Sequence, residues 1–183
     1  MRDPDAGLIR EIAQGNEASF TRLVKRYQNR VLSTIYRYVQ DSSVAQDLAQ
    51  EVFIKVWENA RTFKGKSRFS TWLYRIVVNH CLSYHSKRER HQTVELEESL
   101  TDHGLSVQGK ARKDVERELL KEAMEKLSSR QRIALILFKF EGYSCKEVAG
   151  IMGISFPAAQ SLIFRAIDAL RKKLVPLREK GLI

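Results

Sequence analysis

The chain has 183 residues, of which 43% are hydrophobic and 30% charged, with a formal net charge of +10 and an isoelectric point near 9.8. This length suits one medium domain or two small ones, and the excess of cations favours a polyanionic partner such as nucleic acid. No segment approaches the roughly 20 consecutive apolar residues that cross a bilayer, and the N-terminus has no apolar signal core, so the sequence predicts a cytoplasmic protein without membrane insertion.

The sequence predicts an all-α protein, because prolines and glycines are few and apolar residues recur every three or four positions. A short helix is expected from Asp5 to Gln14, ended by Gly15, and Asn16 then caps a longer helix. One face of the longer helix is basic. The opposite face carries an apolar stripe formed by Phe20, Leu23, Val24, Tyr27, Val31, Ile35 and Tyr38.

A helix from about Val44 to Ala60 is the expected partner of that stripe, and its candidate caps are Asp41, Ser42 and Ser43. Ile54 and Trp57 widen its apolar arc beyond what one neighbour would cover. An apolar arc beside acidic residues is typical of a protein-docking face. The alternative is that these two side chains pack on the following helix.

The thirty residues from Arg61 to Arg90 combine basic and aromatic side chains more densely than any other stretch. Eight cations and one acid give them a formal charge of +7. Lysine and arginine follow phosphates while aromatic faces hold unstacked bases, so this composition favours single-stranded or opening DNA. The alternative is an ordinary helix with aromatic core residues and solvated charges. The interleaved aromatic residues are Phe63, Phe69, Trp72, Tyr74 and Tyr84.

Within this stretch, Gly65 and Ser67 indicate a loop, and a helix of about twenty residues is expected to begin at Ser67 or Ser70 and to reach Lys87. The residues that share its outer face at four-residue spacing are Arg75, Asn79 and Ser83. Arginine and asparagine are well suited to bidentate contacts with guanine and adenine edges, although a single exposed asparagine on a helix more often meets only solvent.

Helical periodicity fails from His91 to about Gly109, where glycine, serine, threonine and acidic residues gather. We interpret residues 91–110 as a flexible acidic linker between a first domain, 1–90, and a second domain, 111–183. Its negative charge can mimic nucleic acid inside a basic channel, or it is merely solvated.

The second domain is expected to open with a helix from about Ala111 to Lys126. Ser128 and Gln131 then resemble a capping box that starts a helix through Phe140, with Phe140 among its buried residues, and Gly142 ends it.

A second capping box, Ser144 with Glu147, predicts a short helix that ends at a turn containing Gly153. Ser155 is then expected to cap a final helix with Pro157 in its first turn. A short helix, a glycine turn and a longer helix form the helix-turn-helix pattern, whose second helix enters the major groove.

Two segments of the sequence are similar to one known family. The first is DLAQEVFIKVWENARTFKGKSRFSTWLYRIVVNHCLSYHSKR, residues 47–88, which resembles sigma region 2. The second is LSSRQRIALILFKFEGYSCKEVAGIMGIS, residues 127–155, which together with the helix that follows to Leu174 resembles sigma region 4. In this order and at these distances they resemble an extracytoplasmic-function sigma factor, the smallest class of the bacterial sigma-70 family.

The resemblance implies a promoter-specificity subunit that binds core RNA polymerase and promoter DNA and initiates promoter melting. The implied contacts with the clamp helices of the largest polymerase subunit are Asp47, Gln50, Glu51, Phe53, Ile54 and Trp57. The implied minus-ten contacts are Phe63, Lys64, Lys66, Ser67, Arg68, Phe69, Arg75, Asn79 and Ser83. The implied minus-thirty-five contacts are Ser155, Ala158, Gln160, Ser161 and Arg165. The linker corresponds to a segment in the RNA exit path, the second domain to one that rests on the polymerase flap, and control by an anti-sigma factor is common in the family.

The last helix departs from the family pattern. Where the family commonly has a threonine and two basic residues, this sequence has Ala158, Gln160 and Leu162, with Arg165 as the matching cation. Phosphate binding at the start of this helix is therefore expected to be weaker than usual. Gln160 can still pair with an adenine edge, whereas Leu162 suits contact with a protein.

Neither catalysis nor metal binding is indicated by the sequence. Cys81 and Cys145 are far apart, the histidines form no ligand pair with a nearby carboxylate, and no phosphate-binding glycine loop, nucleophile elbow or HExxH motif is present. We expect no catalytic residue, no metal, no cofactor and no enzymatic activity. The main alternative function is a helix-turn-helix regulator that binds duplex DNA without polymerase, and a further one is an RNA-binding or structural helical protein.

Overall fold

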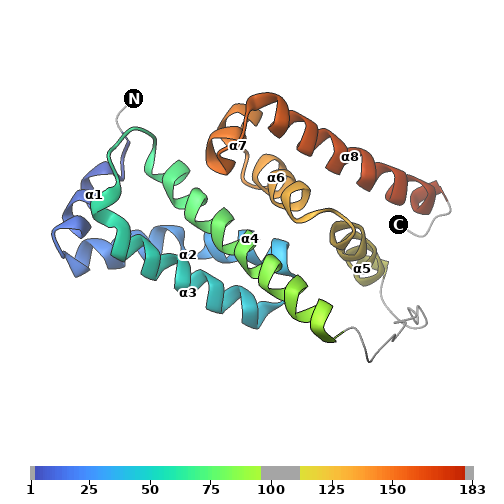
Figure 1. The fold of residues 1–183 in the computed structure, drawn as a ribbon, viewed down its shortest axis with the longest axis horizontal. Helices are drawn as coiled ribbons and strands as arrows, with labels where there is room; N and C mark the ends of the chain where they lie inside the picture. Colours follow the sequence, from blue (N-terminus) through green and yellow to red (C-terminus); the bar gives the residue numbers. More distant parts are fainter. Residues whose placement is uncertain (1–2, 96–111, 180–183) are drawn as a thin grey trace.

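A computed structural model of the chain describes residues 3–95 and 112–179, and describes side chains at 3–90 and 118–176. Across these residues the regular structure is helical throughout, which confirms the all-α prediction (Figure 1). The elements are α1 (Ala6–Ala13), α2 (Glu17–Val39), α3 (Ser42–Asn59), the short 3₁₀ helix η1 (Ala60–Thr62), α4 (Phe69–Glu95), α5 (Arg112–Glu125), α6 (Ser129–Lys139), α7 (Cys145–Met152) and α8 (Phe156–Glu179).

Several helices begin where a short polar side chain accepts a hydrogen bond from a backbone amide of the first turn. Asn16 accepts a hydrogen bond from the amide of Ser19, and Asp41 accepts one from Val44, which selects Asp41 from its three candidate caps. Ser128 and Ser144 each complete a capping box with the residue three positions later, as predicted. These N-caps determine where α2, α3, α6 and α7 begin.

The first group of helices, α1 to α4, packs around the apolar stripe of α2. α3 and α4 contact α2 along its length, and α1 covers one end (Figure 1). The core includes the fully buried side chains Leu23, Val31, Ile35, Val52, Phe69, Leu73, Tyr74 and Val77. The expected pairing of α2 with α3 is therefore present.

The second group, α5 to α8, contains the predicted helix-turn-helix. Gly153 adopts a left-handed conformation with φ of 64°, which a residue with a side chain rarely takes, and α8 runs on from α7 across a bend of 108°. Val148, Ala149 and Ala159 are buried where the two helices meet α6. The small alanines permit that close packing.

Two details differ from the expectations. α4 continues to Glu95 rather than ending near Lys87, because no glycine or proline interrupts the helix formers that follow. Phe140, expected in the core, is 50% exposed, since it lies at the end of α6 with the Arg37 guanidinium 4.9 Å from the centre of its ring. The acidic cluster of the predicted linker falls almost entirely outside the described residues.

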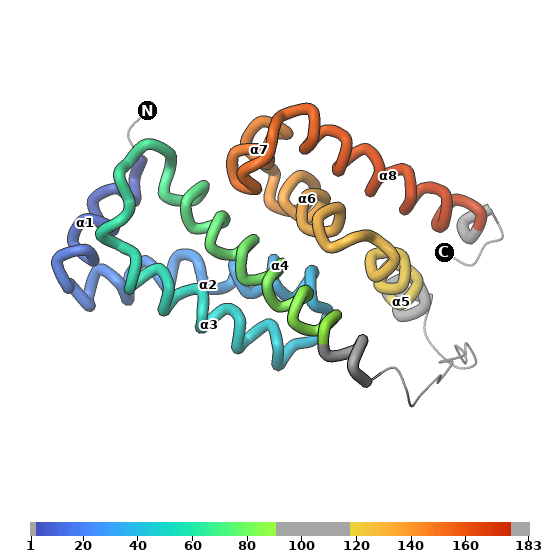
Figure 2. The backbone as a smooth tube through the Cα atoms, in the orientation of Figure 1, coloured from blue at the N-terminus to red at the C-terminus, as the bar shows by residue number. Residues whose placement is uncertain are grey.

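The two groups lie against each other. α4 runs alongside α6 and α7, and α2 also meets α6, so helices far apart in sequence are neighbours in space (Figure 2). No single helix among the described residues is long and apolar enough to cross a membrane; α7 and α8 pass that composition test only as a bent pair, and both contribute to the core of the second group.

Candidate DNA and polymerase interfaces

The outer face of α4 carries three of the predicted minus-ten residues. Arg75, Asn79 and Ser83 are exposed, while Leu73, Val77 and Cys81 on the other side of the helix are fully buried. The helical repeat aligns the exposed side chains in one row about 6 Å apart. This row, Arg75, Asn79 and Ser83, is called the reading face below.

The loop before α4 rests on an aromatic cluster. The rings of Phe63, Phe69 and Trp72 lie within 6.2 Å of one another, centre to centre, and Phe69 also packs against Tyr27 at 5.3 Å. Phe69 is fully buried, so its ring supports the loop from below, whereas Phe63 and Trp72 are only partly buried. The loop is thereby fixed at its base.

The polar residues of the same loop face solvent. Lys64, Lys66 and Arg68 are exposed and Ser67 is half-buried, and Gly65 takes the left-handed conformation that the turn requires. Three cations on a loop beside the start of α4 give a compact positive surface suited to a phosphate backbone. We call residues 63–68 the capture loop.

The predicted polymerase contacts lie along a groove between α2 and α3. The groove has a volume of about 480 Å³, and Gln50, Phe53 and Ile54 line one side of it. Ile54 is 54% exposed, an unusual state for a large apolar side chain in the middle of a helix, while Phe53 is buried at the base. This docking groove has the apolar floor that a partner helix needs.

The other predicted docking residues surround the groove. Asp47 and Glu51 are exposed on α3, and the Glu51 carboxylate lies 3.3 Å from Nδ1 of His80. Trp57 is half-buried with its ring 5.1 Å from Phe20 of α2, so it packs on the preceding helix rather than on the following one. Of the two residues that widened the apolar arc, Ile54 is the more exposed.

The helix-turn-helix presents the predicted minus-thirty-five residues on the first turns of α8. The hydroxyl of Ser155 accepts a hydrogen bond from the amide of Ala158, and Ala158, Gln160, Ser161 and Arg165 are exposed. Leu162 is half-buried and packs against the core of the second helix group.

Two exposed aromatic side chains on α8 were not singled out from the sequence. They are Phe156, which is 46% exposed, and Phe164, which is 72% exposed.

The contact between the two helix groups is centred on a buried carboxylate. The side chain of Glu141, just after α6, is only 3% exposed. Its oxygens accept hydrogen bonds from Arg30 Nε at 2.5 Å, from the Thr34 hydroxyl at 2.7 Å and from the Tyr74 hydroxyl at 2.6 Å. Arg30 also donates to the backbone carbonyl of Glu141 at 2.8 Å. Burial is the main cause that raises the pKa of Tyr74, and its hydrogen bond to Glu141 raises the pKa further. The phenol therefore stays protonated and donates its hydrogen to the carboxylate.

Further polar contacts join the same two groups. Nε of Arg75, in the reading face, donates to the carbonyl of Gly150 in α7 at 2.9 Å. Arg132 of α6 is buried and donates to the carbonyl of Tyr38 at 3.0 Å, as well as to two carbonyls of α5. Tyr74 and Tyr143 complete the interface with ring centres 5.3 Å apart. The reading face and the helix-turn-helix are therefore linked directly.

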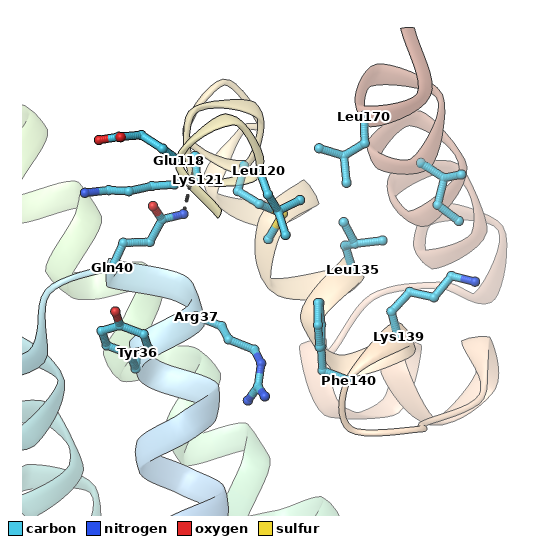
Figure 3. A pocket seen from close by; sticks show the side chains of 12 residues that line it. Tyr36, Arg37, Gln40, Glu118, Leu120, Lys121, Leu135, Lys139, Phe140 and Leu170 are labelled. Atoms are coloured by element: carbon cyan, nitrogen blue, oxygen red, sulfur yellow. Dashed lines mark hydrogen bonds between the residues drawn. The ribbon is translucent and has the colours of Figure 1, made fainter. Parts of the chain in front are cut away.

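A large groove opens where the end of α2 faces the second helix group (Figure 3). Its volume is about 980 Å³, and Tyr36 and Phe140, 51% and 50% exposed, stand on opposite sides of it. Arg37, Lys121 and Lys139 also line it.

Sequence reasoning missed the Glu141 contact altogether. Arg30 belongs to the basic face expected on the longer helix, and Tyr74 is one of the aromatic residues interleaved with cations between Arg61 and Arg90. Both side chains donate to Glu141, which is 111 residues from Arg30 and 67 residues from Tyr74 in sequence. Local periodicity carries no signal for such a pair. The one sequence clue is the hydroxyl of Tyr74, which needs a hydrogen-bond partner when the ring is buried.

No group of three or more histidine, cysteine, aspartate or glutamate side chains in the described parts of the chain is arranged to hold a metal ion. Both cysteines are free thiols, and burial raises the pKa of Cys81 to about 12, which keeps it protonated and unreactive.

Comparisons with known proteins agree with this geometry. Residues 23–91 match the family model for sigma-70 region 2, and residues 117–170 match the model for sigma-70 region 4. Among solved structures, the sigma factor RpoE in complex with the anti-sigma factor NepR from Bartonella quintana is similar with a TM-score of 0.66 and 25% identity, covering 85% of this chain and 96% of that one. CnrH in complex with the cytosolic domain of CnrY shares the fold with a TM-score of 0.71 at 22% identity, covering 94% and 97%.

Curated relatives extend the similarity over almost the full length. The chain is 34% identical to the RNA polymerase sigma-H factor of Pseudomonas aeruginosa over 187 residues, 96% of each chain. It is 32% identical to the ECF RNA polymerase sigma-E factor of Escherichia coli K12 over 184 residues, covering 94% of this chain and 95% of the relative. The match to region 2 contains the reading face, and the match to region 4 contains the helix-turn-helix. The chain therefore belongs to the extracytoplasmic-function sigma factors of the sigma-70 family, the subunits that direct RNA polymerase to promoters.

Proposed function

We propose that residues 1–90 form the unit that docks on core polymerase and opens the minus-ten element, that residues 91–110 link the units, and that residues 111–183 bind the minus-thirty-five element. The observation that carries this assignment is the half-exposed apolar side chain of Ile54 in the groove between α2 and α3. The same helix group also carries the basic capture loop before α4 and the polar reading face on α4. A duplex-binding regulator needs the helix-turn-helix but neither of these features.

The docking groove would receive the clamp helices of the largest polymerase subunit. Its apolar floor is formed by Phe53 and Ile54, and exposed acids on α3 suit a basic partner. An exposed apolar residue flanked by charges has the character of an interface core with a polar rim.

The capture loop and the reading face would act on the minus-ten element together. Lysines of the loop would hold phosphates while Phe63, partly exposed above a rigid aromatic base, offers a ring edge to an unstacked base. Asn79 and Arg75 can pair with base edges once the strands part. Melting then follows from binding energy, because pockets for unstacked bases offset unpairing costs of roughly a few kcal/mol per base.

The first turns of α8 would lie in the major groove at the minus-thirty-five element. Gln160 is exposed there and suits an adenine edge, and Arg165 supplies a cation one turn further on. Because Ala158 and Leu162 provide no charge, phosphate contacts at the helix start are expected to be few, and the domain would rely on the polymerase flap for additional binding energy.

As such a subunit, the protein would perform no catalysis of its own, use no cofactor or metal, and work in the cytoplasm. An anti-sigma factor is a further proposed partner, supported by the complex of the similar Bartonella quintana sigma factor with NepR. An anti-sigma factor for this chain is expected to compete with core polymerase for it; simultaneous binding of both would contradict that role.

The experiment that separates this function from its alternatives is reconstitution with core polymerase, followed by mapping of transcript starts on genomic DNA of the source organism. We expect starts that appear only when the chain and core are combined. A chain that binds duplex promoter DNA but yields no new starts would instead be a regulator.

Neutralising Lys64 and Lys66 together is expected to weaken binding of holoenzyme to forked DNA for all sequences, because both exposed cations belong to the capture loop. Each lost phosphate contact should reduce the slope of log affinity against log salt by about 0.7 to 0.9. The measurement is a salt titration of binding, with Lys25→Gln, an exposed lysine on α2, as the control. An unchanged slope would place these lysines away from DNA.

A further inference from the structure

Glu141 joins the two helix groups through Tyr74, the residue that precedes Arg75 of the reading face. We propose that Glu141 latches the free sigma factor in a closed, self-inhibited conformation, in which the reading face of α4 is tied to the helix-turn-helix. The inference rests on the proposed function of the reading face and adds a means of controlling it. The latch consists of Glu141 with Arg30, Thr34 and Tyr74.

The closed arrangement cannot read a promoter with both units at once. The minus-ten and minus-thirty-five elements are about 25 base pairs apart, which is about 85 Å along a duplex rising about 3.4 Å per base pair. In the structure, however, Arg75 of α4 donates to Gly150 of α7 at 2.9 Å. DNA resists bending over so short a length, since its persistence length is about 150 base pairs. The helix groups must therefore separate before both elements are bound.

The contacts in the closed state also occupy promoter-binding groups directly. The Nε donor of Arg75 is used by the Gly150 carbonyl. Arg68 of the capture loop is close enough to Glu147 at the start of α7 to contribute to lowering its pKa, after the larger effect of the hydrogen bonds with Ser144. The Nε donor of Arg75 is thus engaged by the second unit, and the charge of Arg68 acts on an acid of that unit.

The chemistry of Glu141 suits a reversible latch. Its carboxylate is buried in the closed state, and all three side-chain donors come from the first helix group. A buried carboxylate is costly unless charge-assisted hydrogen bonds compensate its lost hydration, so each donor from the first helix group contributes to holding the closed state. On separation, the carboxylate and Arg30 both reach water, which replaces the lost hydrogen bonds. Opening therefore has a limited cost that a partner can offset.

Core polymerase has access to the closed chain. The docking groove uses Phe20, Val24 and Leu32 of α2, while the latch uses Arg30 and Thr34, and no residue belongs to both. Docking can therefore precede release, and a partner that binds the separated units more tightly shifts the equilibrium toward the open state.

The test compares the full-length chain with Glu141→Gln, which keeps the side-chain shape and removes the charge. Asp168→Asn is the matched control, because Asp168 is an acid of α8 that pairs only with Lys172 of the same helix in the described contacts. Small-angle X-ray scattering reports the radius of gyration, near the value of about 16 Å expected for a compact chain of this length. Fluorescence anisotropy with a fluorescein-labelled forked DNA, with no polymerase present, reports access to the reading face.

We expect Glu141→Gln to increase the radius of gyration and to raise affinity for the forked DNA about tenfold. A tenfold gain corresponds to a wild-type chain of which about 10% is open and a variant that is mostly open. Asp168→Asn should change neither. Expansion without tighter DNA binding, tighter binding without expansion, or an equal gain in Asp168→Asn would each overturn the latch.

A second variant protects the test against misfolding of the region around Glu141. Tyr74→Phe removes one donor from the first helix group and leaves the second unchanged. It should produce a smaller shift in the same direction, and combining it with Glu141→Gln should add little, because both changes act on one interaction. Full additivity would contradict a shared latch. Transcript mapping with core polymerase tests the proposed function independently, so either claim can fail alone.

Discussion

Asn79→Ala is expected to lower the rate of open-complex formation about 5- to 150-fold, while binding to fully duplex promoter DNA changes by less than about twofold. Asn79 is exposed at the centre of the reading face, and its amide is the group suited to an adenine edge. A good bidentate base contact contributes about 1–3 kcal/mol of discrimination, and the contact exists only after strands separate.

The Asn79 measurement uses stopped-flow opening of a mapped promoter beside equilibrium binding to a duplex fragment. Ser43→Ala, an exposed polar residue at the start of α3, is the control and should affect neither quantity. If Asn79→Ala reduces duplex binding and opening by the same factor, the residue does not act on unpaired bases.

Ile54→Asp is expected to weaken binding to core polymerase at least 30-fold without loss of folding. The side chain is 54% exposed in the docking groove, so a carboxylate there meets water in the free chain but lies against an apolar partner in the complex. Truncation at the centre of an interface commonly costs about 2 kcal/mol or more, and an unpaired charge costs at least as much.

Two controls accompany the Ile54 prediction. Lys55→Ala changes the adjacent residue, whose ammonium pairs with Glu58 on the same helix, and should leave affinity for core nearly unchanged. A thermal melt followed by circular dichroism should superimpose for wild type and Ile54→Asp. Normal core affinity in the folded variant would remove the groove from the polymerase interface.

The sequence predicted the elements of this fold well because its helix signals are local. Asn16, the two capping boxes and Gly153 each act within a few residues of themselves, and all appear in the structure with the expected role. The reading face followed from the same logic, since a four-residue spacing determines which side chains share a helix surface.

The long-range contacts could not be predicted in this way. Phe69 was assigned to the loop but is fully buried, because three other aromatic rings surround it, one of them from α2. Trp57 packs on Phe20, and Glu141 is buried by residues more than sixty positions away. Each outcome depends on which side chains meet across different helices, and the local periodicity of a single sequence does not specify those contacts.

Strand opening by the first helix group can be followed by the fluorescence of 2-aminopurine placed in the minus-ten element of a promoter found by transcript mapping. We expect the fluorescence to increase when the chain and core polymerase are present together, and not with either alone, because the capture loop and reading face open DNA only when polymerase holds the strands. An unchanged signal in the complete holoenzyme, at a promoter that it binds, would contradict the assignment of strand opening to the first helix group.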